Sequence, residues 1–234
     1  MAHIILVHGA CHGAWCWSAV TPLLEAAGHE VTALDMPGRG AGVEGLTLGD
    51  QARTILDAYE GKAVLVGHSA GGISISAACE AAPEKVAHLV YVAALLPRDG
   101  DSLGEMMRDL EGPRASLPLL KVPHGYIFDV TTEGAGAALY NDAPEAAMQA
   151  ALAQVCAEPS APHREKVRLG ATFDAAPKSY VLCTQDHVIP EVDQRRMVAG
   201  LDPVDVPELV TGHSPFISMP EELARIIDQI AKAA

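Results

Sequence analysis

Residues 63–80 read AVLVGHSAGGISISAACE, a short apolar run that leads directly into a serine flanked by glycines. The run Ala63–Val66 is typical of a buried strand, and Ile73–Glu80 is typical of a helix. The flanking glycines lack a Cβ, so they leave room for a tight turn that exposes the hydroxyl of Ser69. At the start of the helix, free backbone N–H groups point at any anion that forms there. The segment therefore predicts a strand–turn–helix unit with Ser69 as a candidate nucleophile.

The rest of the chain continues this alternation of strands and helices. Further apolar runs of strand length occupy Ile4–Val7, Val31–Leu34, Leu89–Leu95, Tyr180–Cys183 and, more weakly, Asp205–Val210. Helical patterns occupy Ser18–Ala27, Leu48–Glu60 and Glu221–Lys232. Thr47 and Gly61 are candidate caps for the second of these helices, and Pro207 places the last strand at or near the sheet edge. The pattern predicts an α/β fold, a mostly parallel sheet covered by helices on both faces.

The stretch from about residue 97 to 177 breaks this alternation and is rich in Gly, Pro and Met. Within it, Asp142 and Glu145 resemble a capping pair before a helix at Ala146–Cys156. Tyr126–Phe128 is typical of a short extended piece. We expect this stretch to be an insertion into the domain.

Size and composition limit the classes of function. At 234 residues with 49% hydrophobic residues, the chain can form one sizeable core, so we expect a single domain, residues 1–234. The net charge of −14 and the lack of a basic cluster argue against nucleic acid as a partner. Five cysteines without metal-binding spacing indicate a reducing compartment and no structural metal. Without a signal peptide or an apolar run of roughly 20 residues, we expect a cytoplasmic protein with no membrane partner, either a monomer or a homodimer.

A serine hydroxyl needs a general base, and in this type of fold the acid and then the histidine follow the serine along the chain. His213 fits as the base because it follows the last candidate strand, at the edge of the sheet where catalytic groups gather. Asp186 fits as the acid that orients His213, because it comes directly after the strand at Tyr180–Cys183. Asp99 is the competing acid, since it follows the strand that ends near Leu95. Position in the chain favours Asp186.

The loop after the first strand carries the second half of a candidate oxyanion hole. Such a hole is usually made by the backbone N–H after the nucleophile and one N–H from this loop, which here belong to Ala70 and Ala10. His8 and His12 of the loop suggest a metal site, but no carboxylate lies near them in the sequence, so a packing role is favoured. Three other histidines resemble ordinary surface or loop residues: His29, His88 and His163.

Four motifs give the chain a resemblance to a known family: VHGACHGAWCW at residues 7–17, GHSAGG at 67–72, CTQDHVIP at 183–190 and GHS at 212–214. They resemble the plant methylesterase and hydroxynitrile lyase branch of the α/β hydrolases, which also has bacterial esterase members. The resemblance covers the chain but is weak across the insertion, where only LYND at 139–142 is similar. It implies a six-stranded sheet with the insertion as a cap, no metal or organic cofactor, a triad of Ser69, Asp186 and His213, and an oxyanion hole at Ala10 and Ala70.

The residues and the resemblance together predict a serine carboxylesterase that cleaves a small, largely apolar ester through an acyl-enzyme on Ser69. We expect the cap to set the specificity. Ala70 and Ser214 stand where plant methylesterases usually carry a larger apolar residue and Met, which leaves the substrate open. Candidate substrate contacts, which the sequence does not distinguish from core residues, are Gly9, His12, Met106, Met107, Leu110, Tyr126, Phe128, Tyr140 and Phe216.

Two alternatives share this fold: a cofactor-free lyase that uses the same triad for acid–base work, and a small-molecule receptor without turnover. The related lyases carry Thr at the position of Gly9, Lys at the position of Ser214, and Glu and Cys on either side of the nucleophile. Here the nucleophile lies between His68 and Ala70. Without the Lys, the site lacks the positive charge that stabilises a departing cyanide. The sequence therefore favours ester cleavage.

Overall fold

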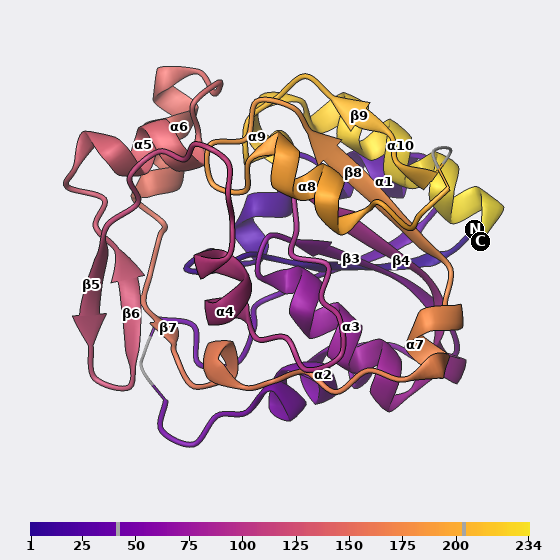
Figure 1. Ribbon diagram of the computed structural model, residues 1–234. Coiled ribbons are helices and arrows are strands. Elements are labelled where there is room, and N and C mark those ends of the chain that lie inside the picture. Colours follow the sequence, from indigo (N-terminus) through magenta and orange to yellow (C-terminus); the bar gives the residue numbers. More distant parts are fainter. Residues whose placement is uncertain (41–42, 203–204) are drawn as a thin grey trace.

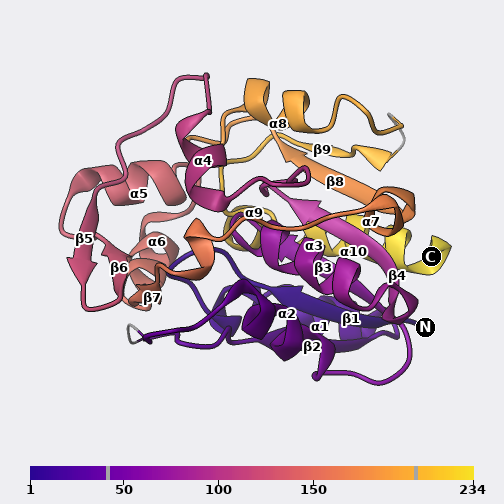
Figure 2. The same cartoon turned by 60° about the horizontal axis from the view of Figure 1, so that its bottom comes forward.

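The computed structural model describes residues 1–40, 43–202 and 205–234. Its main sheet has six parallel strands in the order β2-β1-β3-β4-β8-β9 (Figures 1 and 2). The strands are β1 (His3–Val7), β2 (Glu30–Leu34), β3 (Ala63–His68), β4 (Val86–Val92), β8 (Lys178–Cys183) and β9 (Glu208–Leu209). All six residues of β3, at the centre, are buried, as the continuous apolar runs of a covered parallel sheet predict. The expected six-stranded, mostly parallel sheet is confirmed.

Helices cover the sheet on both faces (Figures 1 and 2). One face packs against α1 (Thr21–Ala26) and α10 (Pro220–Ala233), and the other packs against α2 (Leu48–Leu56) and α3 (Gly71–Ala81). Side chains alternate along β1, so that Ile4 and Leu6 join the first core while Ile5 and Val7 join the second. The other helices outside the insertion are η1 (Ala14–Trp17), η2 (Pro83–Lys85), α8 (Glu191–Met197) and α9 (Pro215–Ser218).

The insertion between β4 and β8 forms a cap at one end of the sheet, away from both chain termini (Figures 1 and 2). Three short antiparallel strands in the order β5-β6-β7 form its own small sheet. Its elements are α4 (Leu103–Arg108), β5 (Leu119–Val122), β6 (Gly125–Phe128), α5 (Glu133–Leu139), α6 (Glu145–Leu152), β7 (Glu158–Pro159) and η3 (Pro162–Arg164). The insertion ends with α7 (Ala171–Ala175), where Phe173 returns to the main core.

Several element ends differ from the sequence-based expectation. β4 stops at Val92, because the following Ala93 takes a positive φ of 43° that ends the extended backbone. β9 is an edge strand, as expected, but spans two residues, and Pro207 before it has no N–H to donate. Thr47 caps α2 as expected, because its side chain accepts the Asp50 N–H. The helix ends at Leu56, before the expected Glu60.

The expected capping pair at Asp142 and Glu145 is wrong. The N-cap of α6 is Pro144, and no side chain accepts a hydrogen bond from the first turn of this helix. Asp142 points elsewhere, since its carboxylate accepts hydrogen bonds from the loop before His213.

Candidate active site

The turn between β3 and α3 holds Ser69 in a left-handed conformation, with φ of 52°. A non-glycine residue rarely adopts this conformation. A Cβ on Gly67 would lie 2.7 Å from the carbonyl oxygen of Gly71, and a Cβ on Gly71 would lie 2.8 Å from that of His8. Glycine at both positions therefore permits the turn, which exposes the Ser69 hydroxyl at the carboxyl end of the sheet.

His213 joins Ser69 to Asp186. Its Nε2 lies 3.1 Å from the Ser69 Oγ, and its Nδ1 lies 2.8 Å from the Asp186 Oδ2. Asp186 follows β8, and His213 follows β9, so neighbouring strands bring the two side chains to the same sheet edge. Because the carboxylate only accepts hydrogen bonds, it fixes the proton on Nδ1 and leaves Nε2 free to accept the serine proton.

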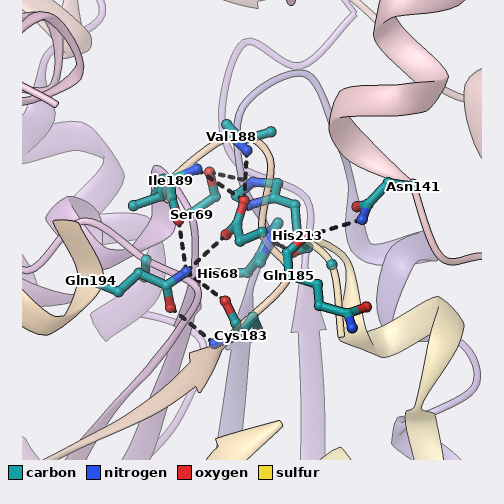
Figure 3. A network of polar contacts seen from close by, with 12 residues as sticks. His68, Ser69, Asn141, Cys183, Gln185, Val188, Ile189, Gln194 and His213 are labelled. Carbon is teal, nitrogen blue, oxygen red and sulfur yellow. Dashed lines mark hydrogen bonds and ion pairs between the residues drawn. The ribbon is translucent and has the colours of Figure 1, made fainter. Parts of the chain in front are cut away.

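The carboxylate of Asp186 is fully enclosed and has a partner on each oxygen. Oδ1 accepts the backbone N–H groups of Val188 (2.7 Å) and Ile189 (2.9 Å). Oδ2 accepts the side-chain amide of Gln194 (3.2 Å) as well as His213, and Figure 3 shows Gln194 reaching toward Cys183 and Ile189 from the same amide. These bonds hold the buried charge in one orientation.

The competing acid lies apart from this network. Asp99 is exposed, and its Oδ1 accepts the backbone N–H of Leu169 at 2.9 Å. Among the acidic side chains that the structure describes, Asp186 is the one within hydrogen-bonding distance of His213.

The N–H groups of Ala10 and Ala70 lie where an oxyanion hole is expected. Both residues line the same cavity as Ser69. Ala70 directly precedes α3, so its N–H belongs to the free donors at the start of a helix. Within the described ranges, neither N–H donates a backbone hydrogen bond to another residue. Both donors are thus available to a ligand.

Two further imidazoles, His68 and His12, surround His213. The ring of His68 lies 4.7 Å from that of His213, and its Nε2–H donates to the His213 carbonyl oxygen (2.8 Å). Burial, with smaller effects from the neighbouring His213 and His12, lowers the pKa of His68 well below its usual value. Burial also lowers the pKa of His12 to about 4. Both rings are therefore neutral near pH 7, so neither adds a positive charge beside His213.

A cavity of about 780 Å³ opens onto the candidate nucleophile, between the sheet edge and the cap. Its wall is mainly apolar, and the cap supplies much of it. The apolar lining includes Leu95, Leu103, Met107, Leu117, Leu119, Phe128, Leu139 and Val188. This volume lies within the range of pockets that enclose small organic molecules.

The comparisons with known proteins identify the family of the chain. The sequence matches the alpha/beta hydrolase family over residues 4–226. The chain belongs to this family. Its relatives include esterase PIR7B of Oryza sativa subsp. japonica, which is 34% identical over 98% of this chain and 95% of its own length. Methyl jasmonate esterase 1 of Vitis vinifera is 31% identical over 99% of this chain and 97% of its own length.

A solved alpha/beta hydrolase structure, that of a pyrethroid hydrolase from Sphingobium faniae JZ-2, superimposes with a TM-score of 0.87. It is 31% identical and covers 99% of this chain and 98% of its own. A methylesterase of Arabidopsis thaliana, methylesterase 7, is 32% identical over 97% of this chain and 95% of its own length. The resemblance to plant methylesterases with bacterial members is confirmed, and these relatives support a carboxylic ester hydrolase.

The structure of this hydrolase divides the predicted substrate contacts into two groups. Four of them line the cavity: His12, Met107, Tyr126 and Phe128. Five do not: Gly9, Met106, Leu110, Tyr140 and Phe216. Of the second group, Leu110, Tyr140 and Phe216 are buried.

Tyr140 and Phe216 are the clearest corrections among these residues. Phe216 is fully buried, because its ring packs edge-on against His68 and beside Trp17. Tyr140 is 1% exposed, and its hydroxyl is 2.7 Å from the His12 Nε2. Both support histidines of the site from behind and do not reach the cavity.

Sequence reasoning missed His163, which was expected to be an ordinary surface or loop residue. It is buried and lines the cavity, with its Nε2 2.7 Å from the Glu158 Oε1 and its Nδ1 2.7 Å from the Tyr126 hydroxyl. Two arginines of the cap, Arg114 and Arg164, also line the cavity. No local signal reveals these residues, because the partners come from separate cap segments that fold together only in three dimensions.

A second missed pair, Asn141 and Asp142, fastens the cap to the two loops that carry Asp186 and His213. The Asn141 amide donates to the carbonyl oxygen of Gln185 (3.0 Å), directly before Asp186 (Figure 3). The Asp142 carboxylate accepts the Gly212 N–H (2.8 Å), directly before His213. The LYND resemblance pointed at this segment without indicating what it does.

Across residues 1–40, 43–202 and 205–234, no group of three or more His, Cys, Asp or Glu side chains is arranged to hold a metal ion. In the same ranges no helix combines the length and the apolarity that crossing a bilayer requires.

Proposed function

We propose that this protein is a serine carboxylesterase that cleaves a small, largely apolar ester through an acyl-enzyme on Ser69. The observation that carries the proposal is the continuous hydrogen-bonded line from Asp186 through His213 to Ser69, which ends in an apolar cavity. The esterase relatives support the same reaction class.

The reaction proceeds in two halves. The Nε2 of His213 removes the hydroxyl proton as the Ser69 Oγ attacks the ester carbonyl carbon, and Asp186 stabilises the imidazolium that forms. The carbonyl oxygen becomes an oxyanion, which accepts hydrogen bonds from the N–H groups of Ala10 and Ala70. His213 then gives its proton to the leaving alcohol. A water molecule, activated by His213 in the same way, releases the acid and restores the Ser69 hydroxyl.

Gly9 distinguishes this reaction from that of the related lyases. A Cβ at residue 9 would lie 2.8 Å from both the Nδ1 of His68 and the Cβ of Ser69. Glycine has no hydroxyl that could hold a cyanohydrin oxygen, and these contacts leave no room for a threonine side chain. Ser214 is buried and uncharged, and no cation follows His213 to stabilise a cyanide anion.

The test is an ester panel, from aryl acetates to longer acyl chains and methyl esters, run with the wild type, Ser69→Ala, His213→Ala and the double variant. Each single change is expected to lower kcat/KM by about four to six orders of magnitude, and the double change scarcely further, because the residues act as a unit. Labelling of Ser69 by a fluorophosphonate probe is expected as well.

Three outcomes contradict the proposal. Additive losses would show that Ser69 and His213 act independently. Ser69-dependent release of cyanide from mandelonitrile without ester turnover would indicate a lyase. Tight binding of small molecules with no turnover of any ester would indicate a receptor.

A further inference from the structure

The peptide group between Ala10 and Cys11 is held on both sides. Its carbonyl oxygen accepts a hydrogen bond from the His12 Nδ1 (2.8 Å), and its N–H donates to the Glu158 Oε2. Ala10 also carries one of the two N–H groups of the proposed oxyanion hole. The two peptide planes meet at the Cα of Ala10, so a displacement of the held peptide that moves this Cα also moves the Ala10 N–H.

Tyr140 acts through His12 on the carbonyl side of the Ala10–Cys11 peptide. A carbonyl oxygen only accepts, so the proton of the His12 ring is on Nδ1 and its Nε2 is an acceptor. The Tyr140 hydroxyl donates to this Nε2 (2.7 Å). Both side chains are 1% exposed, and the burial that lowers the pKa of His12 to about 4 keeps the ring neutral. Tyr140 therefore selects the tautomer in which His12 donates to the Ala10 carbonyl.

Glu158 holds the N–H side of the Ala10–Cys11 peptide. Burial alone raises its pKa, but the pairing with His163 and the Cys11 N–H outweigh this effect, and the pKa lies below its usual value. The Nε2 of His163 lies 2.7 Å from the Glu158 Oε1. The carboxylate is thus charged near neutral pH, and its second oxygen is free to accept the Cys11 N–H.

The backbone at Cys11 makes such a restraint necessary. Its φ is 59°, a left-handed conformation that a non-glycine residue leaves readily unless its surroundings hold it. Relaxation of Cys11 would rotate the Ala10–Cys11 peptide. Two cap residues oppose the relaxation of Cys11: Glu158 accepts the Cys11 N–H, and the Cys156 N–H donates to the Cys11 carbonyl oxygen (3.0 Å).

We propose that Glu158 and Tyr140 are positioning residues of the oxyanion hole, which act from the cap by fixing the Ala10–Cys11 peptide. Neither side chain lines the cavity, so neither contacts substrate. The inference rests on the proposed esterase function, because it assigns the Ala10 N–H to the transition state. It makes the cap part of the catalytic framework in addition to a wall of the pocket.

The first test compares Tyr140→Phe and Glu158→Gln with two matched controls. Tyr59→Phe removes a buried hydroxyl that donates to the Lys85 carbonyl, and Glu80→Gln changes a carboxylate that accepts the Gly170 N–H, both away from the cavity. Loss of a whole oxyanion donor lowers kcat by about 10²–10³-fold, so displacing one is expected to lower kcat by about tenfold with KM nearly unchanged. The affinity of a trifluoromethyl ketone, whose adduct with Ser69 carries an oxyanion, is expected to fall by the same factor.

The second test needs no ester. In protein with ¹⁵N-labelled histidine, the ring shifts of His12, assigned with a His12→Asn variant, are expected to report the Nδ1–H tautomer and to change in Tyr140→Phe. Both controls are expected to keep wild-type kcat, inhibitor affinity and His12 shifts. If the wild type showed no Ser69-dependent ester turnover, the esterase proposal would be refuted. The ¹⁵N spectra would still test whether Tyr140 sets the tautomer of His12.

Two results would overturn the positioning role. One is a kcat within twofold of wild type in both Tyr140→Phe and Glu158→Gln. The other is a loss that appears in KM alone, with the inhibitor affinity retained, because a displaced oxyanion donor acts on the transition state and not on ground-state binding.

Discussion

Ser69 combines an unfavourable backbone with an exposed hydroxyl. A φ of 52° costs an L-residue about 1–2 kcal/mol relative to an ordinary conformation. The close contacts around Gly67 and Gly71 hold the turn in place, and hydrogen bonds to the Ser69 backbone from Leu95 and Gly72 support it. These contacts therefore offset the cost of the backbone conformation and keep the Ser69 side chain at the sheet edge beside His213.

Asp186→Asn is expected to lower kcat by about 10⁴-fold, whereas Asp99→Asn is expected to leave it within twofold of wild type. An amide in place of the Asp186 carboxylate presents a donor to His213 and stabilises the wrong tautomer. Asp99 accepts a backbone N–H of the cap on the surface, far from this bond. Steady-state rates on one aryl acetate check both variants, and a severe loss in Asp99→Asn would assign the acid role to Asp99.

At the scale of elements, the cap strand β6 places Phe128 and Tyr126 on the cavity wall. Phe128→Leu replaces a ring on the cavity wall by a smaller side chain and so enlarges the cavity. The ratio of kcat/KM for a bulky ester to kcat/KM for an acetate is therefore expected to rise at least about fivefold. Phe173→Leu is the matched control, because Phe173 is buried in the main core. An unchanged ratio in Phe128→Leu, or an equal change in both variants, would remove Phe128 from the specificity wall.

The sequence predicts the sheet far better than the cap. Strands such as β1 and β3 are buried on both faces, so each appears as an unbroken apolar run. The strand β5 is largely exposed and has only one neighbour, so it has no comparable pattern. The hydrogen-bonded series of Asp186, His213 and Ser69 was predictable for the same reason, since Ser69 directly follows a recognisable strand.

The rest of the site depends on contacts between distant segments. The cap residue Asp142 has a plausible local role as a helix cap, and nothing in its neighbours reveals that Gly212 is its partner, 70 residues away. Glu158 likewise holds Cys11 across 147 residues. Such pairings follow from how the cap packs on the sheet, which periodicity and motifs do not determine.

For the whole molecule, a falling pH is expected to destabilise the fold already at pH values well above those at which carboxylates bind protons. Burial lowers the pKa of His8, His12 and His68, and that of His12 reaches about 4. As the pH falls below about 6.5, the unfolded chain binds protons at these imidazoles and the folded chain does not. The free energy of unfolding is therefore expected to fall by about 1.4 kcal/mol per pH unit for each such ring.

Urea unfolding between pH 7.5 and pH 4.5 measures this dependence. His12→Asn is expected to reduce the slope by the share of one ring, whereas His124→Asn, which replaces an exposed imidazole, is expected to leave it unchanged. A free energy of unfolding that is constant from pH 7 to pH 5 would mean that these rings bind protons in the folded protein.

The fastening of the cap also bears on protein engineering by cap exchange. A chimera that keeps this sheet and takes its cap from another hydrolase would inherit a new pocket. It would lose three hydrogen bonds, those between Asn141 and Gln185, between Asp142 and Gly212 and between Glu158 and Cys11, unless the transplanted cap supplies equivalent groups. We expect successful chimeras to be those whose donor cap carries these three groups, because a transplanted pocket without them leaves the catalytic loops unanchored.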